Sequence, residues 1–306
     1  MAILMLLLLW NWPVIPAFQS TEVEVTGTKV KLTPPSSLKP ANQFPGFFDE
    51  ETNVSIMVTE MPAPYSEMTK TFTKESLATK NISLISKEDV SIGGIPGQLL
   101  HVRQLAQLYV LKWIVITGND KEVVLIVGTF PEALKSQWSL PIRKSVLSAR
   151  WNATAKTDPW VGLPFVIQDA PELKFAKRMS SAVAMTTNGE LPGKPNNDPL
   201  FIVAPAISRV TVVDQKEFAE KRLYQLEGVS ITRIKHTAEV MIAGLRGYEI
   251  VAEGKQTKPP LGSTIIYQTM LFDDDSYFLM VGFAPADKEN QYLEIFRRVS
   301  RTFRKQ

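Results

Sequence analysis

The sequence predicts an α+β protein of two tandem repeats, each an antiparallel β-sheet packed between an early helix and a C-terminal helix, an α/β/α sandwich. Three blocks of sequence recur in the same order about half a chain apart. The paired blocks are residues 90–100 and 240–250, 118–131 and 273–285, and 142–151 and 295–304. This spacing far exceeds the period of a solenoid unit, so each copy is a complete domain. We expect domains over residues 21–151 and 162–306, joined by a linker over residues 152–161, which has no apolar periodicity.

Runs of alternating or continuous apolar residues predict the strands of both sheets. In the first unit they are residues 53–60, 82–85, 97–104, 109–117 and 123–128. In the second unit they are residues 200–204, 229–234, 248–252, 264–272 and 277–282. Asn119-Asp120 predicts a tight hairpin turn. Gly93 to Gly97 predicts a structural turn, because it lacks the Gly-Lys-Ser/Thr sequence of a phosphate loop.

Apolar residues at helical spacing predict two helices in the first unit. An early helix is expected over residues 66–80 and a closing helix after Pro131, which suits a first helical turn. The inward-facing residues expected are Met68, Phe72 and Leu77 in the early helix, and Leu134, Trp138, Ile142 and Val146 in the closing one.

The second unit repeats this helical pattern. Asp214 followed by Glu217 predicts the start of a helix that Gly228 ends. The faces expected to be buried are Phe218, Arg222 and Leu226 in this helix, and Tyr292, Phe296, Val299 and Phe303 in the last one.

The first residues predict a secretory signal peptide over residues 1–20. The apolar run over residues 2–10 is shorter than the ~20 residues a membrane-spanning helix needs. Prolines interrupt it, and Ala17 offers a small residue for cleavage, although no Lys or Arg precedes the run. We therefore expect an exported protein, periplasmic or secreted, with a membrane anchor through an uncleaved N-terminal segment as the alternative.

Composition narrows the classes of partner and chemistry. The chain has no cysteine, which excludes disulfides, thiolate chemistry and a lipid-modified cysteine and fits a bacterial envelope. A net charge of +3 is too small to indicate a nucleic-acid partner.

The first unit also carries an order of segments that resembles a known family. Pro34-Pro35 ends an early strand, and Gly46 to Asp49 (Gly-Phe-Phe-Asp), residues 54–62 and Gly94 to Gly97 follow in turn. This order resembles the PsbP-like α/β/α superfamily, whose relatives include extrinsic photosynthetic proteins, Ran-binding import factors and small bacterial envelope proteins. In the second unit the Gly-Phe-Phe-Asp segment has no clear counterpart. The resemblance implies a role in binding proteins and no catalysis.

The residues that could carry chemistry are few. Histidine occurs only at His101 and His236, one in each unit, and no Gly-x-Ser-x-Gly motif is present. Asp273 to Asp275 predicts a solvated hairpin tip, with a calcium site as the alternative. We therefore predict no catalytic, cofactor or metal site. A hydrolase would need a histidine that converges with carboxylates.

The remaining candidates are residues for binding a partner. The last helix and the residues after it have a basic side, and the expected partner-binding residues are Arg297, Arg298, Arg301, Arg304 and, beside the linker, Trp160. The sequence thus favours a non-enzymatic protein that binds an envelope protein, with weak contact to an anionic membrane surface as an option. The alternative is a carrier of a small molecule or lipid in a cavity between sheet and helix.

Overall fold

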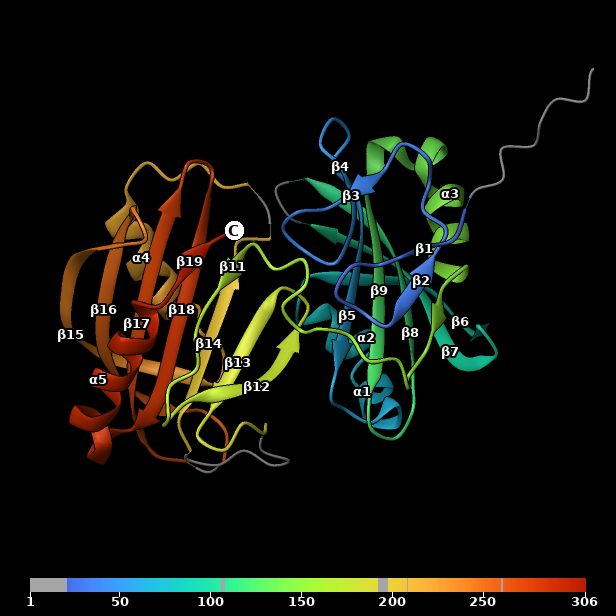
Figure 1. Cartoon of the computed structure of the whole chain (residues 1–306). Helices are drawn as coiled ribbons and strands as arrows, with labels where there is room; N and C mark the ends of the chain where they lie inside the picture. Colours follow the sequence, from blue (N-terminus) through green and yellow to red (C-terminus); the bar gives the residue numbers. More distant parts are fainter. Residues whose placement is uncertain (1–20, 106–107, 192–197, 208, 260) are drawn as a thin grey trace, which may run out of the picture.

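The computed structural model describes residues 21–105, 108–191, 198–207, 209–259 and 261–306. The predicted signal peptide, residues 1–20, lies outside the described residues. Each unit contains one seven-stranded antiparallel sheet with helices on both faces (Figure 1). The predicted α+β class with two tandem modules is confirmed.

The first sheet has the strand order β3-β4-β5-β9-β8-β7-β6. Its strands are β3 (Lys39–Pro40), β4 (Gly46–Asp49), β5 (Val54–Met61), β6 (Ile82–Ile92), β7 (Ile95–Leu105), β8 (Tyr109–Gly118) and β9 (Val123–Pro131). Strand β6 is longer than predicted because it pairs with β7 up to the Gly93–Gly94 turn, where both glycines have positive φ. The expected glycine turn is confirmed.

The second sheet has the order β12-β13-β14-β18-β17-β16-β15, which matches the first position by position. Its strands are β12 (Lys174–Met179), β13 (Ala182–Thr186), β14 (Leu200–Pro205), β15 (Val229–Ile242), β16 (Leu245–Gln256), β17 (Ser263–Asp273) and β18 (Ser276–Pro285). Strand β13 occupies the same position in the second sheet as β4 does in the first. The Gly-Phe-Phe-Asp segment therefore has a structural counterpart, which the sequence concealed because β13 keeps neither the glycine nor the aromatic pair.

Short strand pairs close each unit. Strands β1 (Val23–Glu24), β2 (Val30–Leu32) and β10 (Arg150–Trp151) form one small sheet, and β11 (Phe165–Val166) pairs with β19 (Arg304–Lys305) in the second unit. In both units the segment after the last helix thus pairs with a strand that precedes the main sheet.

The early helix of the first unit is broken, which corrects the prediction of one helix over residues 66–80. The structure has α1 (Tyr65–Lys70) and α2 (Lys74–Ala78). Thr73 caps α2, since its side-chain oxygen accepts a hydrogen bond from the Ser76 amide. A threonine that bonds the backbone in this way starts a new helix and does not continue the old one. Of the expected inward residues, Leu77 is buried, whereas Met68 and Phe72 are partly buried.

The closing helix α3 (Lys135–Leu147) follows a 3-10 turn, η1 (Glu132–Leu134). Trp138, Ile142 and Val146 are buried as predicted, whereas Leu134 lies in the 3-10 turn and is only partly buried. The helix packs closely on β9 because that strand has a glycine at the contact. A Cβ atom added at Gly128 would lie 2.2 Å from Ile142 Cγ2, so a larger residue there would push the helix away.

In the second unit, Asp214 caps α4 (Gln215–Tyr224), and its carboxylate accepts a hydrogen bond from the Glu217 amide as predicted. The helix ends at Tyr224, before the predicted end at Gly228. Its fully buried residues are Ala219 and Leu223. The predicted face of Phe218, Arg222 and Leu226 is only partly buried. The prediction was therefore wrong by one residue, since the buried face begins at Ala219.

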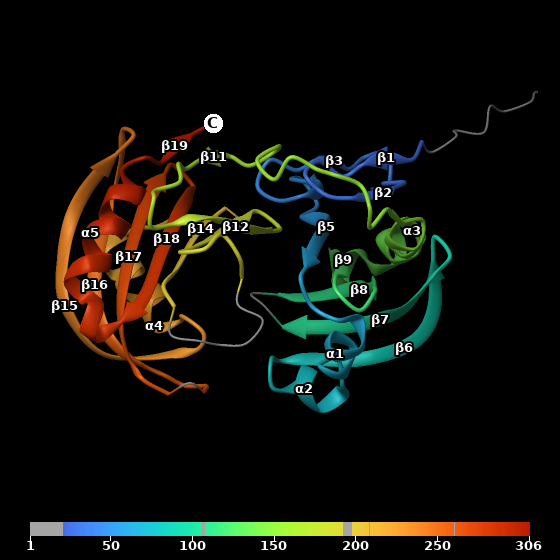
Figure 2. The ribbon, with the colours of Figure 1, turned by 60° about the horizontal axis from the view of Figure 1, so that its bottom comes forward.

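The last helix, α5 (Glu289–Ser300), follows η2 (Ala286–Lys288). Tyr292, Phe296 and Val299 are buried as predicted, and Phe303 is buried just beyond the helix end. Four apolar clusters fill the layers: α3 covers one face of the first sheet and α1 and α2 the other, while α5 and α4 cover the two faces of the second (Figures 1 and 2).

Candidate functional site

The two units meet where β12, at the edge of the second sheet, lies beside β5 of the first (Figures 1 and 2). The β1–β2 turn, the β8–β9 turn and the linker adjoin this contact. Together they line a pocket of about 440 Å³, called here the junction pocket. The ionisable side chains of its wall are four cations and two carboxylates: Lys29, Lys156, Lys177, Arg178, Glu60 and Glu122.

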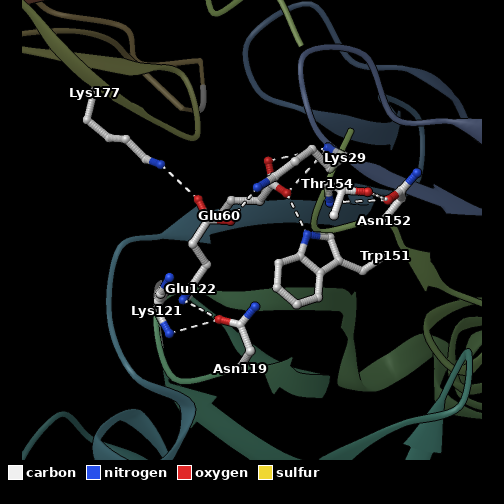
Figure 3. Close-up of polar contacts among 9 residues, drawn as sticks. All are labelled: Lys29, Glu60, Asn119, Lys121, Glu122, Trp151, Asn152, Thr154 and Lys177. Atoms are coloured by element: carbon white, nitrogen blue, oxygen red, sulfur yellow. Dashed lines mark hydrogen bonds and ion pairs between the residues drawn. The ribbon is translucent and has the colours of Figure 1, made fainter. Parts of the chain in front are cut away.

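Glu122 links the two units. Its carboxylate pairs with Lys29 of the first unit through one oxygen and with Lys177 of the second unit through the other, the latter at 3.0 Å (Figure 3). The β8–β9 turn positions it, since Asn119 Oδ1 accepts from the amides of Lys121 and Glu122 at 2.8 Å. Desolvation acts to raise the pKa of Glu122, but the hydrogen bonds and charges of the two lysines outweigh it and hold this pKa below its usual value.

Glu60, near the end of β5, is a partly buried carboxylate of the same wall. It accepts hydrogen bonds from Trp151 Nε1 at 3.0 Å and from the Lys29 amide at 3.3 Å (Figure 3). The Lys29 ammonium is directed to Glu122. Desolvation therefore raises the pKa of Glu60, only partly opposed by the charge of Lys29.

Arg178, in β12, is 9% exposed, and its guanidinium contacts the linker region, the β12–β13 turn and the β1–β2 turn. Its Nη1 donates to the carbonyls of Pro159 (3.1 Å) and Val161 (2.6 Å) in the linker region, and its Nε donates to the carbonyl of Ser180. The guanidinium lies against Gly27, where an added Cβ would lie 2.3 Å from Nη1. Among the described residues Nη2 has no hydrogen-bond partner, and desolvation lowers the pKa of the side chain.

With these six groups ionised, four positive and two negative charges leave the junction pocket with a net charge of +2. A partly desolvated site of this sign attracts anions, because charge interactions are stronger there than in bulk water. The sequence did not reveal the site, since its members come from separate segments with no shared motif.

Two of the four arginines predicted to bind a partner form ion pairs within the protein, and the other two are exposed. Arg297 pairs with Glu249 at 2.6 Å, and Arg298 pairs with Glu172. Arg301 and Arg304 are exposed, and Arg304 donates to the carbonyls of Arg301 and Phe303. Arg297 and Arg298 thus contribute less free charge than the sequence indicated. Their role in binding a partner stays a prediction.

Trp160 is partly buried and packs on Phe175, with ring centroids 5.3 Å apart. Phe175 itself lines the junction pocket. Trp160 therefore lies behind the pocket wall, packed on the second unit.

The two histidines belong to different sheets. His101, in β7, is 8% exposed and stacks on Trp113 with ring centroids 4.0 Å apart, and its Nε2 has no hydrogen-bond partner in the described part of the chain. Desolvation, with a smaller effect of Lys135, lowers its pKa. His236 is exposed on β15, the edge strand of the second sheet.

Asp273 to Asp275 forms the β17–β18 hairpin, as predicted. Asp273 pairs with Lys305 and Asp275 with Arg209, so two of its carboxylates have cationic partners. Within the described ranges, no three or more His, Cys, Asp or Glu side chains lie together in a way that could hold a metal ion.

A second surface of interest is an apolar patch on the β7–β8 hairpin, called here the Tyr109 patch and made of Leu105, Leu108, Tyr109 and Arg103. Leu108 is 76% exposed, and Leu105 and Tyr109 are about half exposed. The Arg103 guanidinium lies 3.5 Å from the centroid of the Tyr109 ring and pairs with Glu132 at 2.7 Å. The sequence did not predict this patch, although Leu105 and Leu108 stand close to a hairpin turn, where polar residues are usual, and could have indicated it.

No protein-family model matches the sequence, and no curated protein sequence matches it. Over the described residues, no helix combines the length and apolar character needed to cross a membrane.

Several solved structures are similar to the chain. One is cyanobacterial PsbP (CyanoP) from Synechocystis sp. PCC 6803, at 13% identity and a TM-score of 0.31, covering 43% of this chain and 92% of that one. Another is LpqN, involved in cell envelope biogenesis of Mycobacterium tuberculosis, at 13% identity and a TM-score of 0.34, covering 46% and 82%. A third is the T6SS immunity protein TplEi of Pseudomonas aeruginosa with a peptide, at 10% identity and a TM-score of 0.31, covering 92% and 97%. One of these structures is thus a PsbP protein, and the sequence resembles the PsbP-like superfamily.

Proposed function

We propose that this chain is an exported, non-enzymatic protein that binds a protein partner in the cell envelope. In this proposal residues 1–20 direct export, and residues 21–151 and 162–306 are the two domains, joined by residues 152–161. The Tyr109 patch of the first domain is the centre of the partner-binding surface.

The exposure and composition of the Tyr109 patch support this proposal. Exposed apolar side chains that gather at one place mark interaction sites more often than scattered ones do. Tyrosine and arginine are the residue types that contribute most binding energy at protein interfaces. Arg103 holds the Tyr109 ring from one side while Glu132 holds Arg103, so little side-chain freedom remains to be lost on binding.

The ion pairs between the units support a surface that extends over both. Glu122 pairs with Lys177, and Arg209 of the second unit pairs with Glu50 of the first at 3.0 Å. A partner that contacts both units would meet them already joined. The exposed Arg301 and Arg304 are proposed as further contacts for an acidic partner. Trp160 packs on Phe175 and is not proposed as a direct contact.

Crosslinking and affinity capture from the envelope fraction test the proposal. The wild-type chain should recover a reproducible partner, and a Leu108→Ala, Tyr109→Ala double variant should recover less by at least tenfold. That loss corresponds to about 1.4 kcal/mol, a modest value for an interface hot spot. Tyr224→Ala is the matched control, since Tyr224 is a 61% exposed aromatic residue on the second unit.

Two results would contradict the proposed role of the patch. One is capture of the partner by the double variant at the wild-type level. The other is an equal loss in the Tyr224→Ala control. A measured hydrolytic turnover that depends on His101 or His236 would contradict the non-enzymatic assignment.

A further inference from the structure

We propose that the junction pocket is a separate binding site for a small amphiphilic oxyanion, a carboxylate or phosphate group attached to an apolar body. This site is additional to the protein-binding role proposed above, and it can be tested without the partner.

The distribution of charge in the pocket favours an anion. Glu122 alone neutralises both Lys29 and Lys177, so one positive charge of this trio is left uncompensated. Lys156, in the linker, is exposed and forms no ion pair with the described residues. An incoming carboxylate would therefore meet two ammonium groups that are not fully neutralised.

Arg178 adds a buried positive charge to the same wall. Its hydrogen bonds all go to backbone carbonyls, which are neutral acceptors. Burying a charge is costly unless an opposite charge compensates for it. Glu60 compensates for this charge only in part, and desolvation raises the pKa of its carboxyl. An anion in the pocket would stabilise the Arg178 charge through space.

The apolar part of the wall indicates the rest of the ligand. Phe175 lines the pocket and packs on Trp160, and Pro159 and Ala155 are further apolar residues of the wall. At about 440 Å³ the pocket falls within the range of ~300–1,000 Å³ typical of small-molecule sites. A pocket wall that carries both cationic and apolar side chains suits a ligand with one anionic end and one apolar end.

Matched small probes test the inference directly. We expect 4-phenylbutyrate and phenyl phosphate to bind the full chain in isothermal titration calorimetry, and the neutral amide 4-phenylbutyramide to bind at least tenfold more weakly. The affinity of the charged probes should fall as salt is raised. The stronger of the two charged probes identifies the ligand as a carboxylate or a phosphate ester.

Charge-removing variants locate the site. Lys156→Gln should weaken binding of the charged probes by about threefold, the effect of one exposed ion pair. Lys156→Gln combined with Lys177→Gln should weaken it by at least tenfold. Lys174→Gln is the matched control, because Lys174 is exposed on the same strand β12 but does not line the pocket. Thermal unfolding checks that each variant is folded.

The inference is overturned if neither charged probe binds the wild-type chain, if the amide binds as tightly, or if Lys174→Gln causes the same loss as the pocket variants. Partner capture is measured separately with the Tyr109 patch variants. Failure of the anion site therefore leaves the protein-binding proposal standing, and failure of partner capture leaves this one standing.

Discussion

Replacing Glu122 with glutamine tests how the two units are held together. The substitution keeps the shape of the side chain but removes the charge that Lys29 and Lys177 share. The side chains of Glu122, Lys29 and Lys177 are 22%, 12% and 33% exposed, so the cluster is neither fully buried nor on the open surface. Exposed ion pairs contribute about 0.2–1 kcal/mol, whereas breaking a buried pair costs about 3–5 kcal/mol. We therefore expect Glu122→Gln to lower the free energy of unfolding by about 2 kcal/mol, midway between these limits.

The pH dependence of this loss has a definite sign. Because the folded-state pKa of Glu122 is lowered, its stabilising contribution is present above the unfolded-state pKa of about 4.3 and is lost as pH falls through the folded-state value. Urea unfolding, followed by tryptophan fluorescence and circular dichroism, should show the full difference at pH 7 and a smaller one at pH 3.

A double-mutant cycle with Lys177→Gln isolates the bridge between the units. The two substitutions should be less than additive, because each removes the same ion pair. Glu24→Gln serves as the control, since the Glu24–Lys31 pair is mostly exposed and its loss should have little effect. A wild-type free energy of unfolding in Glu122→Gln, or fully additive effects with Lys177→Gln, would refute the reasoning.

Two further predictions concern the cores. Gly128→Ala and Gly282→Ala should each lower the free energy of unfolding by about 1–3 kcal/mol, because the added methyl groups collide with Ile142 and Phe296. Urea unfolding measures this loss. A change below about 0.5 kcal/mol, the usual size of a surface effect, would contradict the prediction. Desolvation lowers the pKa of His101 in the folded chain. As the pH falls below the unfolded-state pKa of about 6.5, the unfolded chain therefore binds a proton more readily than the folded chain does, and stability should fall. His101→Gln should remove this part of the pH dependence between pH 7.5 and 5.5; an unchanged dependence would show that other groups cause it.

The correct predictions were those that depend on local sequence. The β8–β9 and β6–β7 turns, the Asp214 cap and the buried faces of α3 and α5 follow from turn chemistry and apolar periodicity, which neighbouring residues set. The errors came where tertiary packing decided between local options. Helix α4 buries Ala219 and Leu223, while the larger Phe218 is only partly buried and packs on Phe272 and Tyr277 of the sheet.

By itself, the sequence determined that the chain is duplicated and that each copy is an antiparallel sheet with early and late helices. The sequence also showed that Gly128 recurs as Gly282. Only the structure gives the reason: each glycine lies in a strand at the point where a helix packs closely on it. The candidate sites were decided by tertiary structure alone. Glu122 is 93 residues from Lys29 and 55 residues from Lys177 in the sequence. The residues around Leu108 in the sequence do not indicate whether another segment covers its side chain. Charge pairing and exposure depend on distances in space between residues remote in the chain, and no local pattern encodes those distances.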